Sequence, residues 1–481
     1  MAKSGTADFY NGVVETSVRL AGDSYLTLDN AGSATSTQKC TLSCWFKRTE
    51  LTVLSYLFHS KNDSGGASFA ITFDAADTIS VTQHSGSAYD FGVTVAPRKF
   101  RDMSAWYHLV VAIDTTLGSG TTNEADRIKI YINGTRQTVV ASSDGSGSQD
   151  FADEDQTVAS FQDGKQTWGA TVTASQIAHI YLAECNGVDG LALDASYFGE
   201  TKNGVWIPIA PNVSEYGNHG FRLQFTSTAH DAPASLGSAD TDNIGADSSG
   251  KNNHFTAVDA IGTHDCALPD SPENNFCTLN PLDKHATFPA LAEGNLKTVN
   301  AGSAWFYCRS TFSVTSGKWY VEIRQTGLYI FMGVLAQTLG LTTNSSSNST
   351  GVYACFNSNG DLIPYSTGTS GSDSGDFTDG DIVGLAYDYD AQTLKIYQNN
   401  TLRATVSSIP KTEAMSFMCG TAEVTNTTVW NFGQDASFAG AITAGTATDG
   451  NGKGVFKYAP PSGYLALCTA NLPEPTIGAN S

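Results

Sequence analysis

Apolar and polar residues alternate along most of the chain, most clearly in a short meander that occurs twice. In the first copy, residues 106–114 (WYHLVVAID) and 127–133 (RIKIYIN) carry apolar side chains at every second position. This period of two predicts half-buried strands, because successive side chains of a strand point to opposite faces of a sheet. Residues 381–406 repeat the pattern and share the motif Lys-Ile-Tyr-x-Asn-x-Thr with the first copy. We therefore predict two antiparallel β-domains, each presenting loops on a rigid sheet.

Turn residues separate the predicted strands about every 10 to 15 residues, which is typical of sandwiches and jelly rolls. The fold class predicted is all-β, with two antiparallel β-sandwich domains, a loop-rich connector between them and very little helix. Prolines that lack an amide donor disfavour central strands inside this connector. The predicted segments are a polar N-terminal arm at 1–16, a first sandwich at 17–213, the connector at 214–284, a second sandwich at 285–433 and a C-terminal loop with a closing segment at 434–481.

Length, composition and charge narrow the picture further. A chain of 481 residues is longer than one core usually fills, and only 15% of its residues are charged. The 47 Asp and Glu residues outnumber the 26 Lys and Arg residues, so the net charge is −21. This charge would repel phosphate backbones and anionic membranes, so we expect no nucleic-acid partner. The acidity itself has two readings, solubility or cation binding.

The nine cysteines are odd in number and lack the dense spacing of a disulfide scaffold. Cys40 and Cys44 lie roughly 13 Å apart if they share one strand, which is beyond disulfide reach. We predict buried, reduced core cysteines. The N-terminus has no apolar signal region, and no stretch approaches the length of a membrane helix. We therefore expect synthesis in the cytoplasm, no membrane insertion, and release by lysis or on a particle.

Two stretches of sequence resemble known sandwich families. TLSCWFKR (41–48), with the strands of the first meander, resembles the laminin-G-like, concanavalin-type jelly rolls. GKWYVEI (317–323), followed by the second meander and WNFGQ (430–434), resembles a SPRY domain. The resemblance implies a jelly roll in the first half of the chain and a lectin-like binding sandwich in the second.

The connector and the end of the chain resemble virion proteins of marine and other tailed phages. The segments concerned are DSSGKNNHF (247–255), DSPENNFCTLNPLD (270–283) and the closing YAPPSGYLALCTANLPEPTI (458–477). The resemblance implies a virion structural protein, a tail fibre or similar appendage, made in the host cytoplasm. It implies other virion proteins and host-surface polysaccharide as partners. It also implies a homo-oligomer, with a trimer expected, which the arm at 1–16 would attach to the particle.

Catalytic patterns are weak. Concanavalin-type glucanases use a Glu-x-Asp-x-Glu strand, and the nearest match, beginning Glu124-Ala125-Asp126, lacks the third carboxylate. The sequence has no nucleophile elbow, phosphate loop or HExxH motif. His108 lies in a half-buried strand and is interpreted as structural. We therefore predict no catalytic residues and no enzyme activity, with a glycoside hydrolase as an alternative.

Candidate ligand-binding residues follow from how proteins hold sugars. A sugar stacks its CH-rich face on an aromatic ring, while its hydroxyls need directional polar partners on loops. Trp168, between Thr167 and Gly169, is expected to be exposed beside a loop. Tyr365, next to a loop rich in Gly and Ser, is the comparable candidate in the second sandwich.

A metal site is the remaining candidate. Hard cations such as Ca²⁺ need several converging oxygen ligands, and laminin-G-like domains often hold Ca²⁺ at a sheet rim. Asp150, Asp153 and Asp155 lie in one acidic loop and could supply those oxygens. The alternative is a solvated acidic loop, and no cofactor is required.

Three functions remain open at this stage. The first is a phage appendage whose lectin-like domains bind host-surface glycans without catalysis. The second is a head-decoration or connector subunit that makes only protein contacts, and the third is a glycoside hydrolase. The sugar, the host and the position on the particle do not follow from the sequence.

Overall fold

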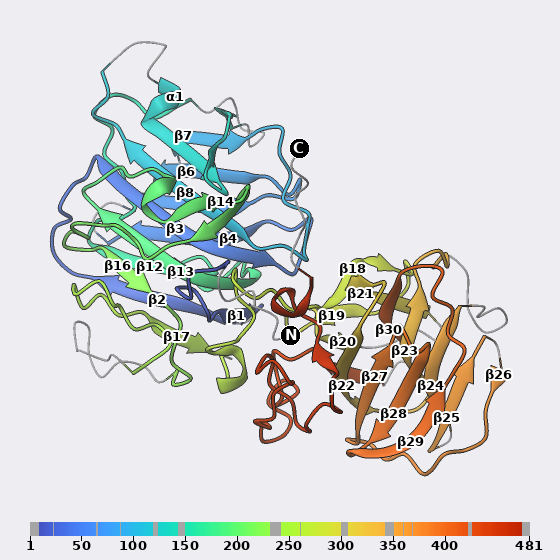
Figure 1. Cartoon of the computed structure of the whole chain (residues 1–481). Helices are drawn as coiled ribbons and strands as arrows, with labels where there is room; N and C mark the ends of the chain where they lie inside the picture. Colours follow the sequence, from blue (N-terminus) through green and yellow to red (C-terminus); the bar gives the residue numbers. More distant parts are fainter. Residues whose placement is uncertain are drawn as a thin grey trace. The chain divides into compact units, whose positions relative to one another are not determined.

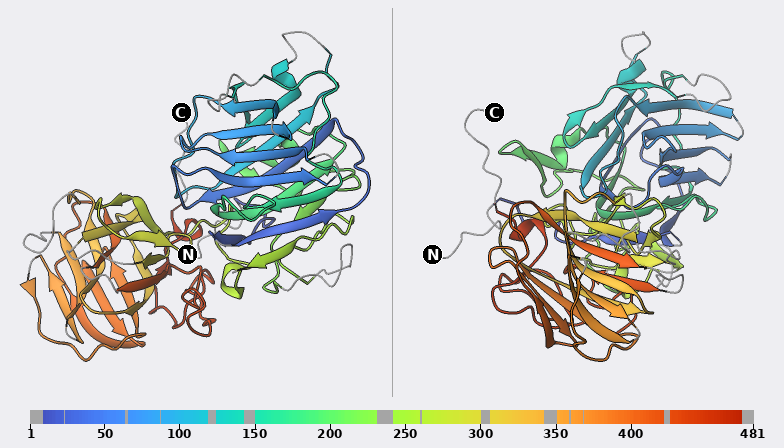
Figure 2. Two further views of the ribbon diagram at one scale, coloured as in Figure 1. Left: turned by 180° about the vertical axis from the view of Figure 1, so that it is seen from behind. Right: turned by 90° about the vertical axis from the view of Figure 1, so that its right-hand side faces the viewer.

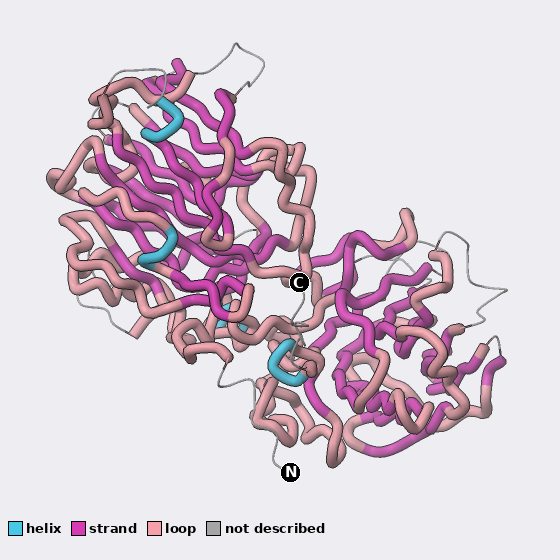
Figure 3. Tube along the Cα trace, turned by 45° about the horizontal axis from the view of Figure 1, so that its top comes forward, coloured by secondary structure: helices cyan, strands magenta, loops and turns pink. Residues whose placement is uncertain are grey.

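The computed structural model of the chain describes most of its residues, and these are almost entirely β-strands and loops (Figure 1). Helix is confined to a few short turns, among them α1 (Glu124–Arg127) (Figure 3). This confirms the predicted all-β fold class. The described residues are 9–22, 24–63, 66–86, 88–118, 124–142, 150–230, 242–259, 261–299, 306–341, 351–358, 360–367, 369–421 and 426–473.

The described residues divide into two compact units. The first lies within Ala7–Glu273 and the second within Asn274–Ser481. The division therefore falls inside the predicted connector of 214–284, which does not form a separate piece. Strands β16 (Phe221–Leu223) and β17 (Thr256–Asp259) join the sheets of the first unit.

The first unit contains two large antiparallel sheets with a shared core (Figure 2). The core follows from the period of two, because Ile128, Ile130 and Ile132 of one strand are all buried in it. One sheet has the order β1 (Val18–Ala21), β13 (His179–Asp189), β3 (Lys39–Arg48), β8 (Tyr107–Asp114), β9 (Ile128–Ile132) and β10 (Thr135–Arg136), with β16 paired to β13. The other has the order β11 (Val139–Ala141), β7 (Ala88–Val95), β6 (Ile79–Ser85), β5 (Ser68–Phe73), β4 (Ser55–Asn62), β12 (Gly164–Trp168), β2 (Ser24–Asn30) and β17.

The outer face of the β1–β10 sheet is covered by a small hairpin, β14 (Gly199–Lys202) and β15 (Val205–Pro208). Trp206 of this hairpin packs toward His108 of β8, with the two ring centroids 5.9 Å apart. The short turn η2 (Ala195–Tyr197) covers a neighbouring part of the same face. Much of the outer face of this sheet is therefore covered by other segments of the same unit.

The second unit repeats the two-sheet design with its own core. The predicted second meander forms the neighbouring strands β27 (Ile382–Asp388), β28 (Thr393–Gln398) and β29 (Thr401–Val406). One sheet has the order β18 (Leu279–Lys284), β21 (Phe306–Val314), β30 (Met415–Thr421), β23 (Ile330–Ala336), β24 (Val352–Ser358), β25 (Asp361–Ser366) and β26 (Thr369–Ser370). The other has the order β19 (Ala290–Ala292), β20 (Lys297–Val299), β31 (Thr427–Asn431), β22 (Lys318–Thr326), β27 (Ile382–Asp388), β28 (Thr393–Gln398) and β29 (Thr401–Val406), with β32 (Leu465–Ala466) parallel to β22.

The described part of the closing segment, up to residue 473, is fixed to the second unit. Glu322, fully buried in β22, accepts hydrogen bonds from the backbone N–H groups of Lys457 and Tyr458. Burial raises the pKa of this carboxyl to about 7, although the hydrogen bonds from those N–H groups act in the opposite direction. A single buried carboxyl therefore anchors the return of the chain onto its sheet.

The motif at 270–283 fastens the beginning of the first unit and the end of the second. Asp270 forms a buried ion pair with Lys47 (2.5 Å), and Glu273 accepts N–H groups of Val13 and Val14. Val14 is only 3% exposed, so the described part of the predicted polar arm, residues 9–16, is not free. Farther along the motif, the N–H of Cys277 donates to the carbonyl of Leu467. Each half of the motif acts within its own unit.

All nine cysteines are buried and none forms a disulfide, in agreement with the predicted buried, reduced thiols. Burial raises the pKa of several of their thiols, for example that of Cys40 to about 12, so these thiols stay protonated at neutral pH. Among the described residues, no helix has the length and apolar character needed to cross a membrane.

Candidate functional sites

A pocket of about 250 Å³ opens in the first unit where β8 and β9 pass beside η2. We call it the Tyr197 pocket. Its lining comes from two parts of the sequence separated by more than 60 residues, and it combines carboxylates, an amine and two phenol rings. The lining residues are Ala112, Asp114, Leu117, Asp126, Lys129, Tyr131, Ala192, Leu193, Asp194 and Tyr197.

The period of two in β9 places half of this lining. Because Ile128, Ile130 and Ile132 face the core, Lys129 and Tyr131 lie on the opposite face of the strand, where both are partly exposed. The other wall is η2, whose N-cap Asp194 accepts hydrogen bonds from the N–H and hydroxyl of Ser196. This cap fixes the turn that carries Tyr197.

Negative charge dominates the Tyr197 pocket. Burial would raise the pKa of Asp114, but hydrogen bonds from Thr116 and Lys39 outweigh burial and lower that pKa overall. Burial and the nearby charge of Asp194 raise the pKa of Tyr131, so its phenol stays neutral. Asp114 is therefore ionised at neutral pH and is a poor proton donor.

The lining of the Tyr197 pocket suits a sugar with free hydroxyls. Carboxylates accept hydrogen bonds from hydroxyl groups, the Lys129 amine donates them, and the rings of Tyr131 and Tyr197 offer faces for CH groups. Three carboxylates and one amine line the pocket, and two of the carboxylates have cationic partners outside it, Asp114 with Lys39 and Asp126 with Arg136. A bound anion would lie among these carboxylates, which disfavours an anionic ligand. The volume of the Tyr197 pocket lies below the roughly 300–1,000 Å³ of sites for drug-sized ligands, so the pocket suits one sugar unit better than a buried oligomer.

A second pocket, of about 260 Å³, lies in the second unit and includes the predicted residue Tyr365. We call it the Tyr365 pocket. Its walls come from the hairpin of β25 and β26 and from the end of β29. The lining residues are Pro364, Tyr365, Ser366, Thr369, Ser370, Gly371, Thr405, Val406 and Ser407. The role of Tyr365 in binding remains a prediction, now placed in a defined hollow.

The predicted exposure of Trp168 is wrong. The side chain is 1% exposed and lies in the core of the first unit, where its ring meets that of Phe58 at 5.1 Å. The neighbouring Thr167 and Gly169 suggested a loop, yet β12 is inserted between β2 and β4, so Trp168 is held in a central strand. A buried ring of this kind offers no face to a ligand from solvent.

The three predicted metal ligands, Asp150, Asp153 and Asp155, are all exposed. The side chain of Asp155 accepts a hydrogen bond from Gln38 at 3.0 Å. Among the described residues, the three carboxylates do not come close enough together to share one ion. Their arrangement matches the alternative of a solvated acidic loop, and it gives the proposed Ca²⁺ site no support.

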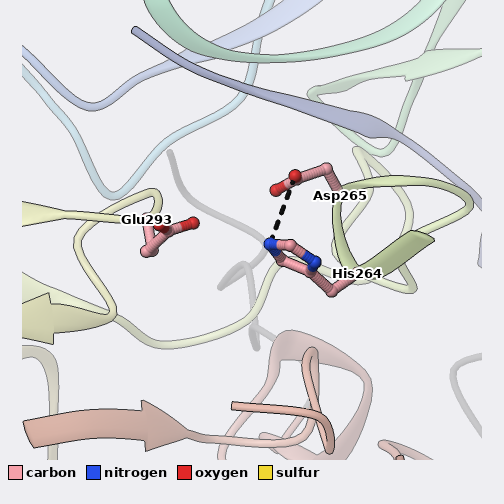
Figure 4. A group of neighbouring side chains, drawn as sticks. All are labelled: His264, Asp265 and Glu293. Atoms are coloured by element: carbon pink, nitrogen blue, oxygen red, sulfur yellow. Dashed lines mark ion pairs between the residues drawn. The ribbon is translucent and has the colours of Figure 1, made fainter. Parts of the chain in front are cut away.

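His264 and Asp265 form an ion pair in the first unit, with Nε2 and Oδ2 3.3 Å apart (Figure 4). Asp265 also accepts from the guanidinium of Arg19 at 2.7 Å and is nearly fully buried. Its charge is thus used to hold the first strand of the unit. Glu293, which Figure 4 also draws, belongs to the second unit and is not part of this pair.

His108 has the structural role predicted for it. Its Nδ1 accepts a hydrogen bond from Trp206 at 3.0 Å, so the proton resides on Nε2, which lies 2.9 Å from the hydroxyl of Ser43. Its ring stacks on Trp45 at 4.8 Å, and burial lowers its pKa to about 3. A neutral histidine enclosed in this way joins the sheet to the covering hairpin.

Comparison with known proteins bears on the first unit most directly. Residues 20–181 match the family model of the concanavalin A-like lectin/glucanases superfamily. The match extends from β1 into β13 and so includes most strands of the first unit. It also contains the β8 and β9 residues of the Tyr197 pocket, while those of η2 lie just beyond it. No curated protein matches the chain.

Solved structures similar to the chain include SPRY domains and a pentraxin. The TRIM65 PSpry domain has a TM-score of 0.28 at 12% identity, over 32% of this chain and 89% of that one. The SPRY domain of human HERC1 has a TM-score of 0.27 at 13% identity, over 33% and 97% of the two chains. The heptameric SAP-like pentraxin from Limulus polyphemus has a TM-score of 0.27 at 12% identity, over 38% and 78%.

Proposed function

We propose that the chain binds saccharides through the Tyr197 pocket and does not hydrolyse them. The observation that carries the proposal is the lining of that pocket, in which strands β8 and β9 and the turns beside them bring together two tyrosine rings, three carboxylates and one amine. The superfamily whose model matches residues 20–181 includes lectins and glucanases, which supports saccharide binding and does not by itself separate binding from hydrolysis. Loops and turns held by a stable sandwich suit recognition, because they can vary without disturbing the core.

The preferred ligand is a neutral or amine-bearing glycan. An acidic sugar would bring its carboxylate next to Asp114, Asp126 and Asp194, and Lys129 is the cation in the lining. Lys39 and Arg136 lie outside the lining and are each paired with one of these carboxylates. Neutral hydroxyls can instead exchange hydrogen bonds with all four charged groups of the lining. One shallow contact of this size gives weak affinity, so useful adhesion would depend on several copies binding together.

The biological setting that we propose is the virion of a tailed phage. Support comes from the resemblance of 270–283 and 458–477 to phage virion proteins. In this setting the chain would be a homo-oligomeric appendage, with a trimer expected, attached to other virion proteins and directed at host polysaccharide. Repetition would raise avidity by about 10² to 10⁴. Imaging of intact particles with this chain labelled tests the location, and light scattering tests the oligomer.

A glycan array tests the binding function. We expect the full chain to bind neutral or amino glycans, and we expect Tyr197→Ala to weaken that binding about five- to tenfold through loss of one stacking ring. Asp29→Asn is the matched control, because Asp29 is exposed on β2 of the same unit and does not line the pocket. Absence of any glycan binding by the full chain would favour the structural-subunit alternative, in which the domains make only protein contacts. Glycan binding that Tyr197→Ala leaves unaffected would contradict the Tyr197 pocket as the binding site.

A further inference from the structure

We infer that the second unit has its own saccharide site, the Tyr365 pocket, and that this site takes an uncharged sugar. The inference does not depend on the Tyr197 pocket, because the two pockets lie in different units and share no residue. It assigns a binding role to the second sandwich, which the proposed function leaves unused.

The lining of the Tyr365 pocket is free of charge. Among the described residues that form it, none is acidic or basic, although the whole chain has a net charge of −21. Hydroxyl groups provide the polar character instead, and they belong to Ser366, Thr369, Ser370, Thr405, Ser407 and Tyr365 itself. Hydroxyls both donate and accept hydrogen bonds, so they can match the mixed hydrogen-bonding pattern of a sugar.

The Tyr365 ring is held in place from behind. It packs edge-on against Phe331, with the ring centroids 4.9 Å apart and the ring planes at 76°. The side chain remains partly exposed, so a portion of the ring is left for a ligand. A ring that is already ordered loses little entropy on binding, which favours its use as a stacking surface.

The hollow is kept open by a tight backbone contact next to the ring. The N–H of Gly371 donates to the carbonyl of Pro364 at 2.7 Å. A Cβ atom at Gly371 would lie 2.8 Å from Cγ of Pro364, which is closer than real Cβ atoms approach. The absence of a side chain at this position therefore preserves the hairpin geometry that forms one wall.

The pocket lies where the edges of the two sheets of the second unit meet. β26 ends one sheet and β29 ends the other, and residues of both strands line the hollow. An edge strand leaves one row of backbone N–H and C=O groups outside its sheet, and these groups are directional partners for hydroxyls. Backbone and side-chain partners are thus available together.

An uncharged ligand follows from the missing counter-charges. The charged group of a uronic acid or amino sugar would be desolvated on binding without gaining an ion pair from the lining. A neutral pyranose pays no such cost and can place its CH groups on Tyr365 and Pro364. The volume of about 260 Å³ again suits one sugar unit.

The test uses the full chain and four probes, the methyl glycosides of glucose, galactose, mannose and N-acetylglucosamine. Saturation-transfer NMR is recorded first on Tyr197→Ala, in which the other pocket is impaired. Thr405→Arg then places bulk and charge in the Tyr365 pocket from an exposed position on β29. Thr401→Arg is the matched control, because Thr401 is exposed on the same strand but does not line the pocket.

We expect at least one probe to bind to Tyr197→Ala, and Thr405→Arg to weaken that binding about tenfold or more while Thr401→Arg leaves it unchanged. Binding of none of the four probes to Tyr197→Ala would overturn the inference, as would equal effects of the two arginine substitutions. Charged analogues that bind more tightly than neutral probes would overturn the assigned ligand class. Glycan-array binding that is unchanged in Tyr197→Ala, together with probe binding that Thr405→Arg weakens, would count only against the proposed function of the first unit.

Discussion

The two units share a sandwich design but use charge in different ways. In the first unit, buried carboxylates face buried cations, as in the pairs Lys47–Asp270 and Arg19–Asp265. In the second, the buried Glu322 is held by backbone N–H groups, and the buried Arg309 pairs with Asp283, which is partly exposed. The surface pockets also differ in charge, since charged side chains line the Tyr197 pocket and, among the described residues, none lines the Tyr365 pocket. The same type of fold can therefore be stabilised by ion pairs or by backbone hydrogen bonds to a buried carboxyl. It can likewise offer a ligand either charged or uncharged polar groups.

The largest expected effect concerns the buried ion pair of the first unit. Asp270→Asn would leave the Lys47 ammonium, which is almost fully buried, without its charged partner. Breaking such a pair costs about 3–5 kcal/mol of the free energy of unfolding. Amide hydrogen exchange on the full chain should show the loss in strands of the first unit only. The double variant Lys47→Met/Asp270→Asn should recover part of it, and a loss spread evenly over both units would contradict the comparison.

Acid should stabilise the second unit through Glu322. Its pKa is about 7 in the folded chain against an ordinary value of 4.5, so its stabilising contribution is complete below pH 4.5 and is lost as the pH rises through 7. Lowering the pH from 7.5 to 5 should add about 2–3 kcal/mol to the stability of the second unit. Hydrogen exchange at both pH values should show this gain, and Glu322→Gln should abolish it. An unchanged pH dependence in Glu322→Gln would contradict the role of this carboxyl.

The first unit should respond to acid in the opposite direction through His108. Its pKa of about 3 in the folded chain lies below the ordinary value of 6.5, so its stabilising contribution is complete above pH 6.5 and is lost as the pH falls toward 3. Lowering the pH to 5 should cost about 2 kcal/mol. Glu184, whose pKa is raised by burial, acts against this trend in the same unit. Comparing the pH dependence of stability between wild type and His108→Gln isolates the contribution of this histidine. Identical pH profiles would contradict that contribution.

The strands were more predictable from the sequence than the sites. Ile128, Ile130 and Ile132 alternate so regularly that β9 and its buried face could be predicted locally. Asp270 could not be assigned, because its partner Lys47 is 223 residues away. Trp168 was misplaced for a related reason, since its burial depends on β12 pairing with strands far away in the sequence.

The candidate sites were predictable only in part. Tyr365 could be proposed because an aromatic residue beside a loop of small polar residues is a local signal, and its role in binding stays a prediction. The Tyr197 pocket was missed, because η2 meets β8 and β9 only after the chain has folded. Asp126 had been noted only as part of an incomplete catalytic motif. The position of Tyr197 just after the capping residue Asp194 was the one available hint.

The smallest expected effect concerns ligand charge in the Tyr197 pocket. Asp126→Asn removes one of its three carboxylates, so binding of an acidic glycan such as a glucuronic-acid polymer should improve by a few-fold, or about 0.5–1 kcal/mol. Asp29→Asn changes the net charge equally and should have no effect. Equal gains in both variants would show that overall charge, and not the pocket, controls selectivity.

The most direct test of binding without turnover is prolonged incubation of the full chain with an immobilised polysaccharide for which the glycan array shows affinity. Adsorbed protein and released reducing sugar are measured together, for wild type and for Tyr197→Ala. We predict saturable adsorption that persists, weakens in Tyr197→Ala, and is accompanied by no release of sugar. Progressive loss of the polysaccharide, abolished by substitution of a single Asp or Glu, would contradict the account and establish a glycoside hydrolase.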